Sequence, residues 1–371
     1  AYGYVNTKSF IIFRRLTSLE SEKDFFLINS LKHKLEKALE KRKNLPQFQA
    51  SFRWIFAEAD DLPGLIIDRF LIETAVGKKQ VLSLQVNTAG MQAMLKDPLL
   101  LLQEVTSKYF NITWEDTAVL LRYGKHSSEF LLGDSNLQVL KLAPFLDLSQ
   151  SQIVLNSLLQ TLKMQVNFIQ GQKTGFFLDQ ADNITLLLNH LHKKVETEIK
   201  VLDLFCYVGQ WGAAIAHYYK KKGAHSHITL VDASEIALDL AVKNIQEQEG
   251  LATSLKMDIQ KKIRDIPDNY YDIVICDPPA FIKSAKDKTA GEEAYLKLNR
   301  QAIQKVKREG IFVTCSCSHH LSSKQFDSII KEVLKGRENY HIIEGRQALD
   351  HPLLANFPEG QYLKAKIILF Y

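Results

Sequence analysis

The chain has 371 residues, of which 46% are apolar, and a formal net charge of +5. A chain of this length more readily builds two cores than one, so we predict two domains and a further fragment. The sequence has no apolar run near the roughly 18 to 20 residues that span a bilayer and no secretory signal layout at its start, which predicts a cytoplasmic protein. The mild positive charge permits nucleic acid as a partner without requiring it.

All four cysteines lie in the second half of the chain, beside segments that resemble strands. This distribution is not the spread framework of a disulfide-bonded fold, so we expect free thiols. Two of the cysteines form a Cys-x-Cys motif, which lacks the second pair of ligands that a structural zinc site needs, and we predict no metal. The four are Cys206, Cys276, Cys315 and Cys317.

The first half is typical of a small mixed α/β domain, predicted over residues 17–171. Between Asp24 and Lys43 apolar residues recur at helical spacing, and Pro46 follows as a stop, which predicts an amphipathic helix. Its basic residues are interleaved with Glu36 and Glu40, so we interpret the positive cluster as a solvated helix face. Strands are predicted at Phe52–Phe56, Leu65–Asp68 and Val81–Val86, and a helix near Leu99–Phe110.

The second half alternates buried strands with amphipathic helices, which predicts a Rossmann-like, doubly wound and mostly parallel sheet over residues 172–371. In such sheets ligands bind beyond the carboxyl ends of the strands, so the residues that follow each strand are the candidates for function. The predicted strands are Lys200–Phe205, His227–Asp232, Thr253–Met257, Tyr271–Cys276, Gly310–Cys315 and Tyr362–Phe370.

A nucleoside cofactor is indicated by the turn after the first of these strands. Gly209 and Gly212 let the backbone turn tightly before a helix N-terminus, although such glycines also serve helix packing. Asp232 follows roughly 20 residues later, at the spacing of a carboxylate that binds ribose hydroxyls. Asp258 follows the third strand and is placed to receive an adenine amino group. Helix N-capping is the alternative for both aspartates.

Cys276-Asp277-Pro278-Pro279 ends the fourth strand, and the fifth ends in Thr314-Cys315-Ser316-Cys317-Ser318. The two prolines fix the backbone, which indicates a transferase acting on a planar nitrogenous group, unless the loop is only a structural turn. A thiolate at the same edge of the sheet is suited to conjugate addition on a pyrimidine, because ring carbon 5 is unreactive until a nucleophile has added to carbon 6.

We therefore predict Cys317 as the nucleophile and Asp277 as the group that binds the base and stabilises the charge that develops during addition. Cys315 is assigned to packing; a small buried hydrophobe is the alternative for Cys317 as well. His319 and His320 are candidate proton acceptors or simply solvated side chains.

These residues resemble a known family, the bacterial large-subunit ribosomal RNA cytosine-C5 methyltransferases of the position-1962 type. The resemblance covers nearly the whole chain, and its most specific segment is Lys173-Thr-Gly-Phe-Phe-Leu-Asp-Gln180. Two departures are that Gln210 replaces the usual second glycine of the cofactor turn, and that residues 1–16 resemble only the last strand of an N-terminal PUA-like RNA-binding domain. The other segments are 58–69, the turn at Gly209, Asp232, the Asp277 loop, Ser316–Ser318, Asp350-His-Pro and 357–364.

The resemblance implies S-adenosylmethionine as methyl donor, Cys317 as nucleophile, large-subunit ribosomal RNA as substrate and a homodimer. The cofactor-binding residues predicted in this way are Lys173, Thr174, Phe176, Asp179, Gln180, Phe205, Tyr207, Gly209, Asp232, Asp258 and Asp277.

The target base must be single-stranded or flipped out to reach the thiol, with a basic surface on the backbone. The predicted substrate contacts are Pro278, Pro279, Phe281, which would stack on the base, and Lys283. Lys286 and Lys288 extend the basic loop, unless these lysines are merely solvated. Three alternatives stay open: methylation of a guanine or adenine nitrogen without the thiol, uracil as target, and a non-catalytic RNA-binding assembly factor.

Overall fold

The computed structural model describes residues 2–5, 13–17, 27–95, 97–123, 137–171, 174–191, 197–357 and 360–371. The chain forms two compact units, and both are built from discontinuous segments. Unit 1 comprises Ala1–Asn156, Val166–Leu178 and Leu349–Gly360, and unit 2 comprises Ser157–Gln165, Asp179–Ala348 and Gln361–Tyr371. The domain boundaries predicted from the sequence stay a prediction.

Unit 1 is built on a mixed sheet in the order β7-β6-β5-β4-β8, with β3 also paired to β4. The β4–β5 pair is a long antiparallel hairpin, whereas β5 and β6 run parallel. Its strands are β3 (Phe52–Phe56), β4 (Leu65–Thr74), β5 (Gly77–Val86), β6 (Thr117–Tyr123), β7 (Leu137–Lys141) and β8 (Ser151–Asn156), and a separate antiparallel pair is formed by β1 (Tyr2–Val5) and β2 (Phe13–Thr17). The short strand β9 (Thr161–Val166) falls almost entirely within the segment Ser157–Gln165 of unit 2.

The helices of unit 1 are α1 (Leu27–Arg42), α2 (Ala89–Met94) and α3 (Pro98–Tyr109). In α1 the buried residues Leu31, Leu35, Ala38 and Leu39 follow the helical period, so one face of the helix joins the core with β3 and α3. Two basic side chains of this segment are paired within unit 1, Lys32 with Glu104 and Lys43, just after the helix, with Glu40. Arg42, by contrast, is only 1% exposed, so the solvated-face interpretation is wrong for this member of the cluster.

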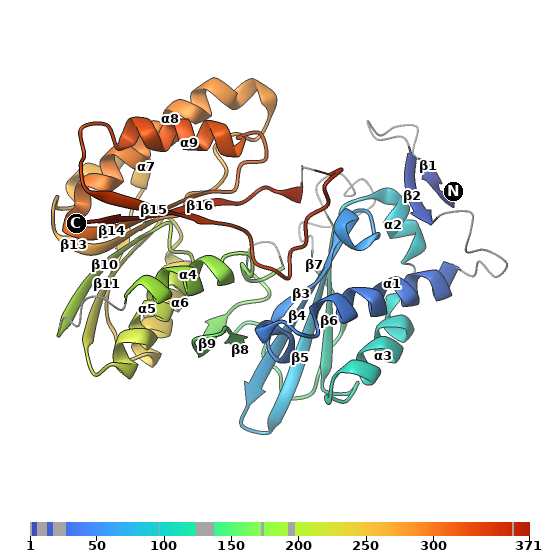
Figure 1. Ribbon diagram of the computed structural model, residues 1–371. Coiled ribbons are helices and arrows are strands. Elements are labelled where there is room, and N and C mark those ends of the chain that lie inside the picture. The colour runs from blue at the N-terminus through green and yellow to red at the C-terminus, as the bar shows by residue number, and fades with distance from the viewer. Residues whose placement is uncertain are drawn as a thin grey trace. The chain divides into compact units, whose positions relative to one another are not determined.

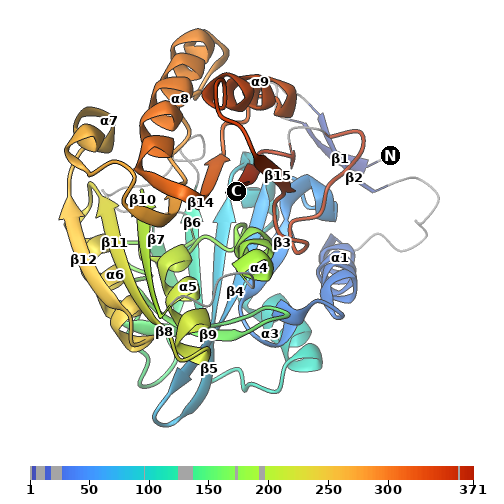
Figure 2. The same cartoon turned by 60° about the vertical axis from the view of Figure 1, so that its left-hand side comes forward.

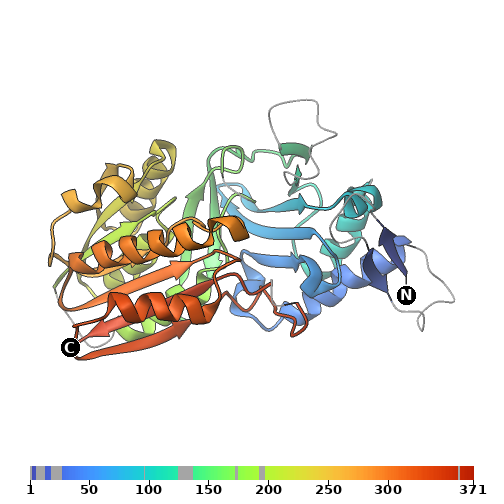
Figure 3. The ribbon, with the colours of Figure 1, turned by 90° about the horizontal axis from the view of Figure 1, so that it is seen from above.

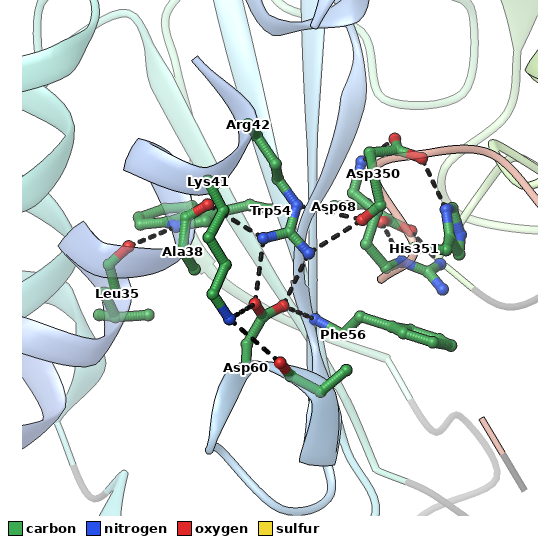
Figure 4. A network of polar contacts seen from close by, with 12 residues as sticks. Leu35, Ala38, Lys41, Arg42, Trp54, Phe56, Asp60, Asp68, Asp350 and His351 are labelled. Atoms are coloured by element: carbon green, nitrogen blue, oxygen red, sulfur yellow. Dashed lines mark hydrogen bonds and ion pairs between the residues drawn. The ribbon is translucent and has the colours of Figure 1, made fainter. Parts of the chain in front are cut away.

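A buried polar network connects the C-terminal segment of unit 1 to its sheet (Figure 4). The Arg42 guanidinium donates to both oxygens of Asp60, with Nη2 2.7 Å from Oδ2, and to the Asp350 carbonyl. One Asp350 oxygen accepts the Arg53 N–H at 2.8 Å and the other lies 2.7 Å from His351 Nδ1. These groups are almost fully buried, and their mutual pairing offsets the free-energy cost of removing their charges from water.

Unit 2 contains a seven-stranded sheet in the order β12-β11-β10-β13-β14-β16-β15. All neighbours are parallel except β16, which is antiparallel to both β14 and β15. The chain order reverses between β10 and β13, so the ligand-binding crevice of this fold is expected there. The strands are β10 (Glu198–Leu204), β11 (His225–Asp232), β12 (Leu251–Lys256), β13 (Tyr271–Cys276), β14 (Val306–Ser316), β15 (Tyr340–Gly345) and β16 (Lys364–Phe370).

Helices cover both faces of this sheet (Figure 1). On one face α5 and α6 pack against β10, β11 and β12, as Figure 2 also shows, and α4 packs beside α5. On the other face α8 and α9 lie side by side (Figure 3). The helices are α4 (Ala181–His190), α5 (Gln210–Lys221), α6 (Glu235–Glu247), α7 (Ile259–Lys262), α8 (Lys288–Ala302) and α9 (Ser323–Val333).

The predicted doubly wound, mostly parallel sheet is confirmed, and each of its six predicted strands is present. The strand β15 was missed, as were β6 to β9. In the described part of the chain, no helix combines the length and apolarity required to cross a membrane.

Candidate active site

The turn between β10 and α5 has an unusual backbone. Phe205, Tyr207 and Gly209 have φ angles of 60°, 49° and 76°, and non-glycine residues rarely adopt this left-handed region. The conformation is held in part by Asp232, whose Oδ2 accepts the Tyr207 N–H at 3.0 Å. Backbone strain of this kind is concentrated at functional sites. The turn lies at the carboxyl end of β10, where the sequence places a cofactor.

Asp232 and Asp258 follow the next two strands. Besides Tyr207, Asp232 accepts the Ser234 N–H at 2.9 Å, but the N-cap of α6 is Ser234, whose hydroxyl accepts from Ala237. The N-cap alternative for Asp232 is therefore wrong. Asp258 does occupy the N-cap position of α7, yet its side chain makes no capping hydrogen bond; it is half exposed and pairs with Lys261 at 3.1 Å.

A third carboxyl, Asp203, lies inside the same edge of the sheet. Its Oδ2 accepts the Gly212 N–H at 3.1 Å, and its Oδ1 is buried with no hydrogen-bond partner among the described residues. Burial raises the pKa of Asp203 to about 8, with further contributions from the charges of Asp277 and Asp232. The neighbouring charges of Asp277 and Asp232 favour a cationic ligand at this edge.

Asp277 is held by side chains from two other elements. Gln180 Nε2 donates to Asp277 Oδ2 at 2.7 Å, and the Trp211 indole N–H points at the same oxygen at 3.4 Å. Two donors on one oxygen require that oxygen to act as an acceptor. Asp277 therefore enters the site as a preoriented hydrogen-bond acceptor.

Cys317 lies just beyond β14 and beside the proline loop, with Sγ 3.9 Å from the Pro278 carbonyl oxygen. The two loops are joined by the buried Ser318, whose hydroxyl accepts the Ile282 N–H at 3.2 Å and shares a hydrogen bond of 2.9 Å with the Tyr295 hydroxyl. The predicted meeting of the thiol with the Asp277 loop thus has a definite structural basis.

Lys364 lies close to the same thiol. Its Nζ donates at 2.7 Å to the carbonyls of Ser318 and Tyr362, and no carboxylate of the described residues forms an ion pair with it. Burial lowers the pKa of Lys364 to about 8, and the charge of Cys317 acts in the opposite direction. The thiol group therefore has a buried ammonium nearby.

The other cysteines of unit 2 differ from Cys317 in exposure. Cys206, Cys276 and Cys315 are buried, whereas Cys317 is partly exposed. Burial raises the pKa of each of the three buried thiols, which keeps them protonated. Cys317 is the one cysteine of the chain that a substrate could reach.

The predicted substrate contacts occupy the loop after β13. Pro278 is buried, Pro279 is exposed, and Lys283, Lys286 and Lys288 are exposed. The Phe281 ring packs on Tyr295 with centroids 4.8 Å apart. His319 and His320 are exposed, and the His319 ring lies 5.3 Å from that of Tyr362.

The segment that carries the family resemblance is divided between the units. Thr174 and Phe176 are buried in unit 1, where the Thr174 hydroxyl bonds to Asp68, and Lys173 lies outside the described residues. In unit 2, Asp179 accepts a hydrogen bond from the Tyr362 hydroxyl, and Gln180 binds Asp277.

Sequence reasoning gave no role to several residues at this edge. Asp203 and Trp211 lie in the segment predicted to form the cofactor turn but were given no function, and Asn183 was not considered. Lys364 ended a family segment without a function of its own. A lysine or an aspartate within a buried strand is the signal that could have identified two of them, because such residues are rarely buried without a partner.

A doubly wound sheet with a strained glycine turn and carboxylates beyond its strands defines a Rossmann-like, S-adenosylmethionine-dependent methyltransferase. The model of the family "Methyltransferase small domain" matches residues 170–344. Ribosomal RNA large subunit methyltransferase I of Escherichia coli O139:H28 is 30% identical over 321 residues, covering 85% of this chain and 73% of the relative. The chain belongs to the ribosomal RNA large subunit methyltransferase I family.

Two further similarities extend over more of the chain. A Methanocaldococcus jannaschii protein, provisionally named a ribosomal RNA large subunit methyltransferase, is 29% identical over 383 residues, covering 100% of this chain and 86% of the relative. The solved structure of SMU.776, provisionally classed as a methyltransferase and complexed with SAH, has a TM-score of 0.69 at 18% identity and covers 94% of this chain and 83% of that one. At this identity the structure supports the fold alone.

Proposed function

We propose that this enzyme methylates carbon 5 of a cytosine in large-subunit ribosomal RNA through a covalent adduct with Cys317. The observation that carries the proposal is the partly exposed Cys317 thiol next to the Pro278 carbonyl, in the loop that presents Asp277. A methyltransferase acting on a base nitrogen has no use for a thiol at this place. The name of the Escherichia coli relative supports large-subunit ribosomal RNA as the substrate.

The residues at the sheet edge fit S-adenosylmethionine, which supplies a methyl group on a positively charged sulfonium. Asp232 and Asp277 would offset that charge, and the buried Oδ1 of Asp203 has acceptor capacity that the described residues do not use. We assign Asp232 to the ribose hydroxyls and Asp258 to the adenine amino group. Phe205, Tyr207 and Gly209 form the turn beneath them.

In the proposed reaction the Cys317 thiolate adds to carbon 6 of the cytosine and forms a carbon–sulfur bond with it. The ammonium of Lys364 favours the thiolate form by its charge. Asp277 binds the base edge and stabilises the positive charge that a protonated ring nitrogen would carry. Carbon 5 then accepts the methyl group and loses its proton to a base, after which elimination across carbons 5 and 6 releases the thiolate.

The substrate base must leave its stack to reach Cys317, and the exposed lysines 283, 286 and 288 are our candidates for holding the RNA backbone. Pro279 and Phe281 would border the flipped base. The cytoplasmic location and the homodimer predicted from the sequence stay predictions.

The test is incubation with large-subunit ribosomal RNA and a methyl-labelled donor, followed by digestion and mass spectrometry of the nucleosides. We expect labelled 5-methylcytidine with the wild type, none with Cys317→Ala, and label with Cys315→Ala, the matched control at a buried neighbouring thiol. Label on a purine, or full activity of Cys317→Ala, contradicts the proposal.

A further inference from the structure

A directed chain of hydrogen bonds leads from a backbone amide to Asp277. The Arg346 N–H donates to Asn183 Oδ1 at 2.8 Å. The Asn183 Nδ2 group donates to Gln180 Oε1 at 2.7 Å, and the Gln180 Nε2 group donates to Asp277 Oδ2 at 2.7 Å. Asn183 and Gln180 are 1% and 5% exposed, so solvent cannot substitute for these partners.

The direction of this chain is fixed by its first member. A backbone N–H can only donate, so the atom of Asn183 that faces Arg346 must be its oxygen. The nitrogen of Asn183 must then face Gln180, which in turn directs the nitrogen of Gln180 to Asp277. Gly345 leaves the space that the Asn183 amide oxygen occupies, since a Cβ there would collide with it.

Asp277 therefore accepts hydrogen bonds from Gln180 and from the Trp211 indole, which hold it as an acceptor. Cytosine and uracil differ in what they offer such a group. Cytosine presents an amino group at position 4, and a proton at N3 once it is activated. Uracil also carries a proton at N3 but presents a carbonyl oxygen at position 4, so the two bases differ for such a group at position 4. An acceptor carboxylate that spans N3 and position 4 can bind both donors of activated cytosine, but the position-4 oxygen of uracil repels it.

We propose that Gln180, oriented by Asn183, is a positioning residue that makes the site select cytosine over uracil. This inference rests on the proposed function, because it takes Asp277 as the group that reads the target base. It differs from the cofactor role that the family resemblance suggests for Gln180.

Asn183→Asp is the most informative variant, because it does not touch Asp277 or the base. The new carboxylate still accepts the Arg346 N–H, but it cannot donate to Gln180 Oε1. The Gln180 amide is then expected to reverse and to turn its oxygen to Asp277, which must take up a proton or move away. Loss of one charged hydrogen bond predicts a decrease of about tenfold to hundredfold in the cytosine-to-uracil ratio of kcat/KM.

Gln180→Glu tests the same link directly, since glutamate has no N–H to donate, and the same decrease is expected. The matched control is Asn244→Asp. Asn244 is fully buried in the same unit and bonds to Gln165 and Val208 rather than to the chain that ends at Asp277. Its substitution should leave the ratio unchanged.

The substrates are the RNA that the wild type methylates and the same RNA with uracil at the modified position. A second measurement needs no RNA: carbon-13 NMR of the Asp277 carboxyl during a pH titration, whose midpoint should move to higher pH in Asn183→Asp and stay in place in Asn244→Asp. If no RNA is methylated by the wild type, the proposed function fails, while the titration still decides whether the relay exists. An unchanged ratio or an unchanged midpoint in Asn183→Asp overturns the inference.

Discussion

The variant Asp203→Asn tests how the buried Asp203 carboxyl makes the stability of the protein depend on pH. The carboxyl of Asp203 is buried and its pKa is raised to about 8, from the usual value of 3.8. The unfolded chain therefore releases this proton from about pH 4 upward, while the folded chain keeps it until about pH 8. The free energy of unfolding therefore decreases between about pH 4 and pH 8, so the stability present at low pH is lost as the pH rises.

The size of the effect follows from the width of the window. Each pKa unit corresponds to about 1.4 kcal/mol, so the three pH units from 5 to 8 give at most on the order of 4 kcal/mol. An asparagine does not titrate, and its oxygen can still accept the Gly212 N–H. The variant should therefore gain stability relative to the wild type as the pH rises, whatever constant cost its buried amide adds.

The assay is urea unfolding followed by circular dichroism at pH 5 and at pH 8. The control is Asp239→Asn, at an exposed aspartate of α6, which should show no pH-dependent difference from the wild type. If the difference between Asp203→Asn and the wild type is the same at both pH values, the reasoning about this carboxyl is refuted.

Two further substitutions test other buried charges. Asp60→Asn leaves the buried Arg42 guanidinium without its ion pair and should lower the free energy of unfolding by about 3 to 5 kcal/mol. The control Glu36→Gln, at an exposed ion pair, should lower it by less than about 1 kcal/mol. Equal effects of the two variants in urea titrations would contradict this. Lys364→Met should slow iodoacetamide alkylation of Cys317 about tenfold at pH 7. The two rates should converge above pH 8, where the wild-type ammonium loses its proton, and equal rates at pH 7 would exclude an influence of Lys364 on the thiol.

The strands β10, β11, β13, β14 and β16 could be predicted because they are mostly buried and appear as apolar runs, whereas β12 was predicted although it is mostly exposed. The strand β13 was predicted with its observed bounds, Tyr271–Cys276. The strand β15 lies at the edge of the sheet and is mostly exposed or half-buried, so its sequence lacks that signal. In β9, Thr161–Val166 alternates strictly between polar residues and the buried Leu162, Met164 and Val166, a strand signal that was missed in the sequence.

The sequence could predict those residues of the site that directly follow the ends of strands. Cys317 and Asp277 follow neighbouring parallel strands, so their proximity is a consequence of topology alone. Partnerships between distant segments could not be foreseen: Gln180 lies 97 residues from Asp277, and Thr174 lies 106 residues from Asp68. Such pairs depend on how the loops pack, and no local pattern encodes them.

The most direct test of the central claim is incubation of the enzyme with S-adenosylmethionine and RNA that contains 5-fluorocytidine. Fluorine replaces the proton that must leave carbon 5, so the release step cannot occur. We expect a covalent protein–RNA adduct that survives denaturing electrophoresis, with the RNA attached to Cys317 in peptide mass spectrometry and no adduct in Cys317→Ala. An enzyme that methylates ordinary RNA yet forms no adduct with the fluorinated RNA would contradict the covalent mechanism.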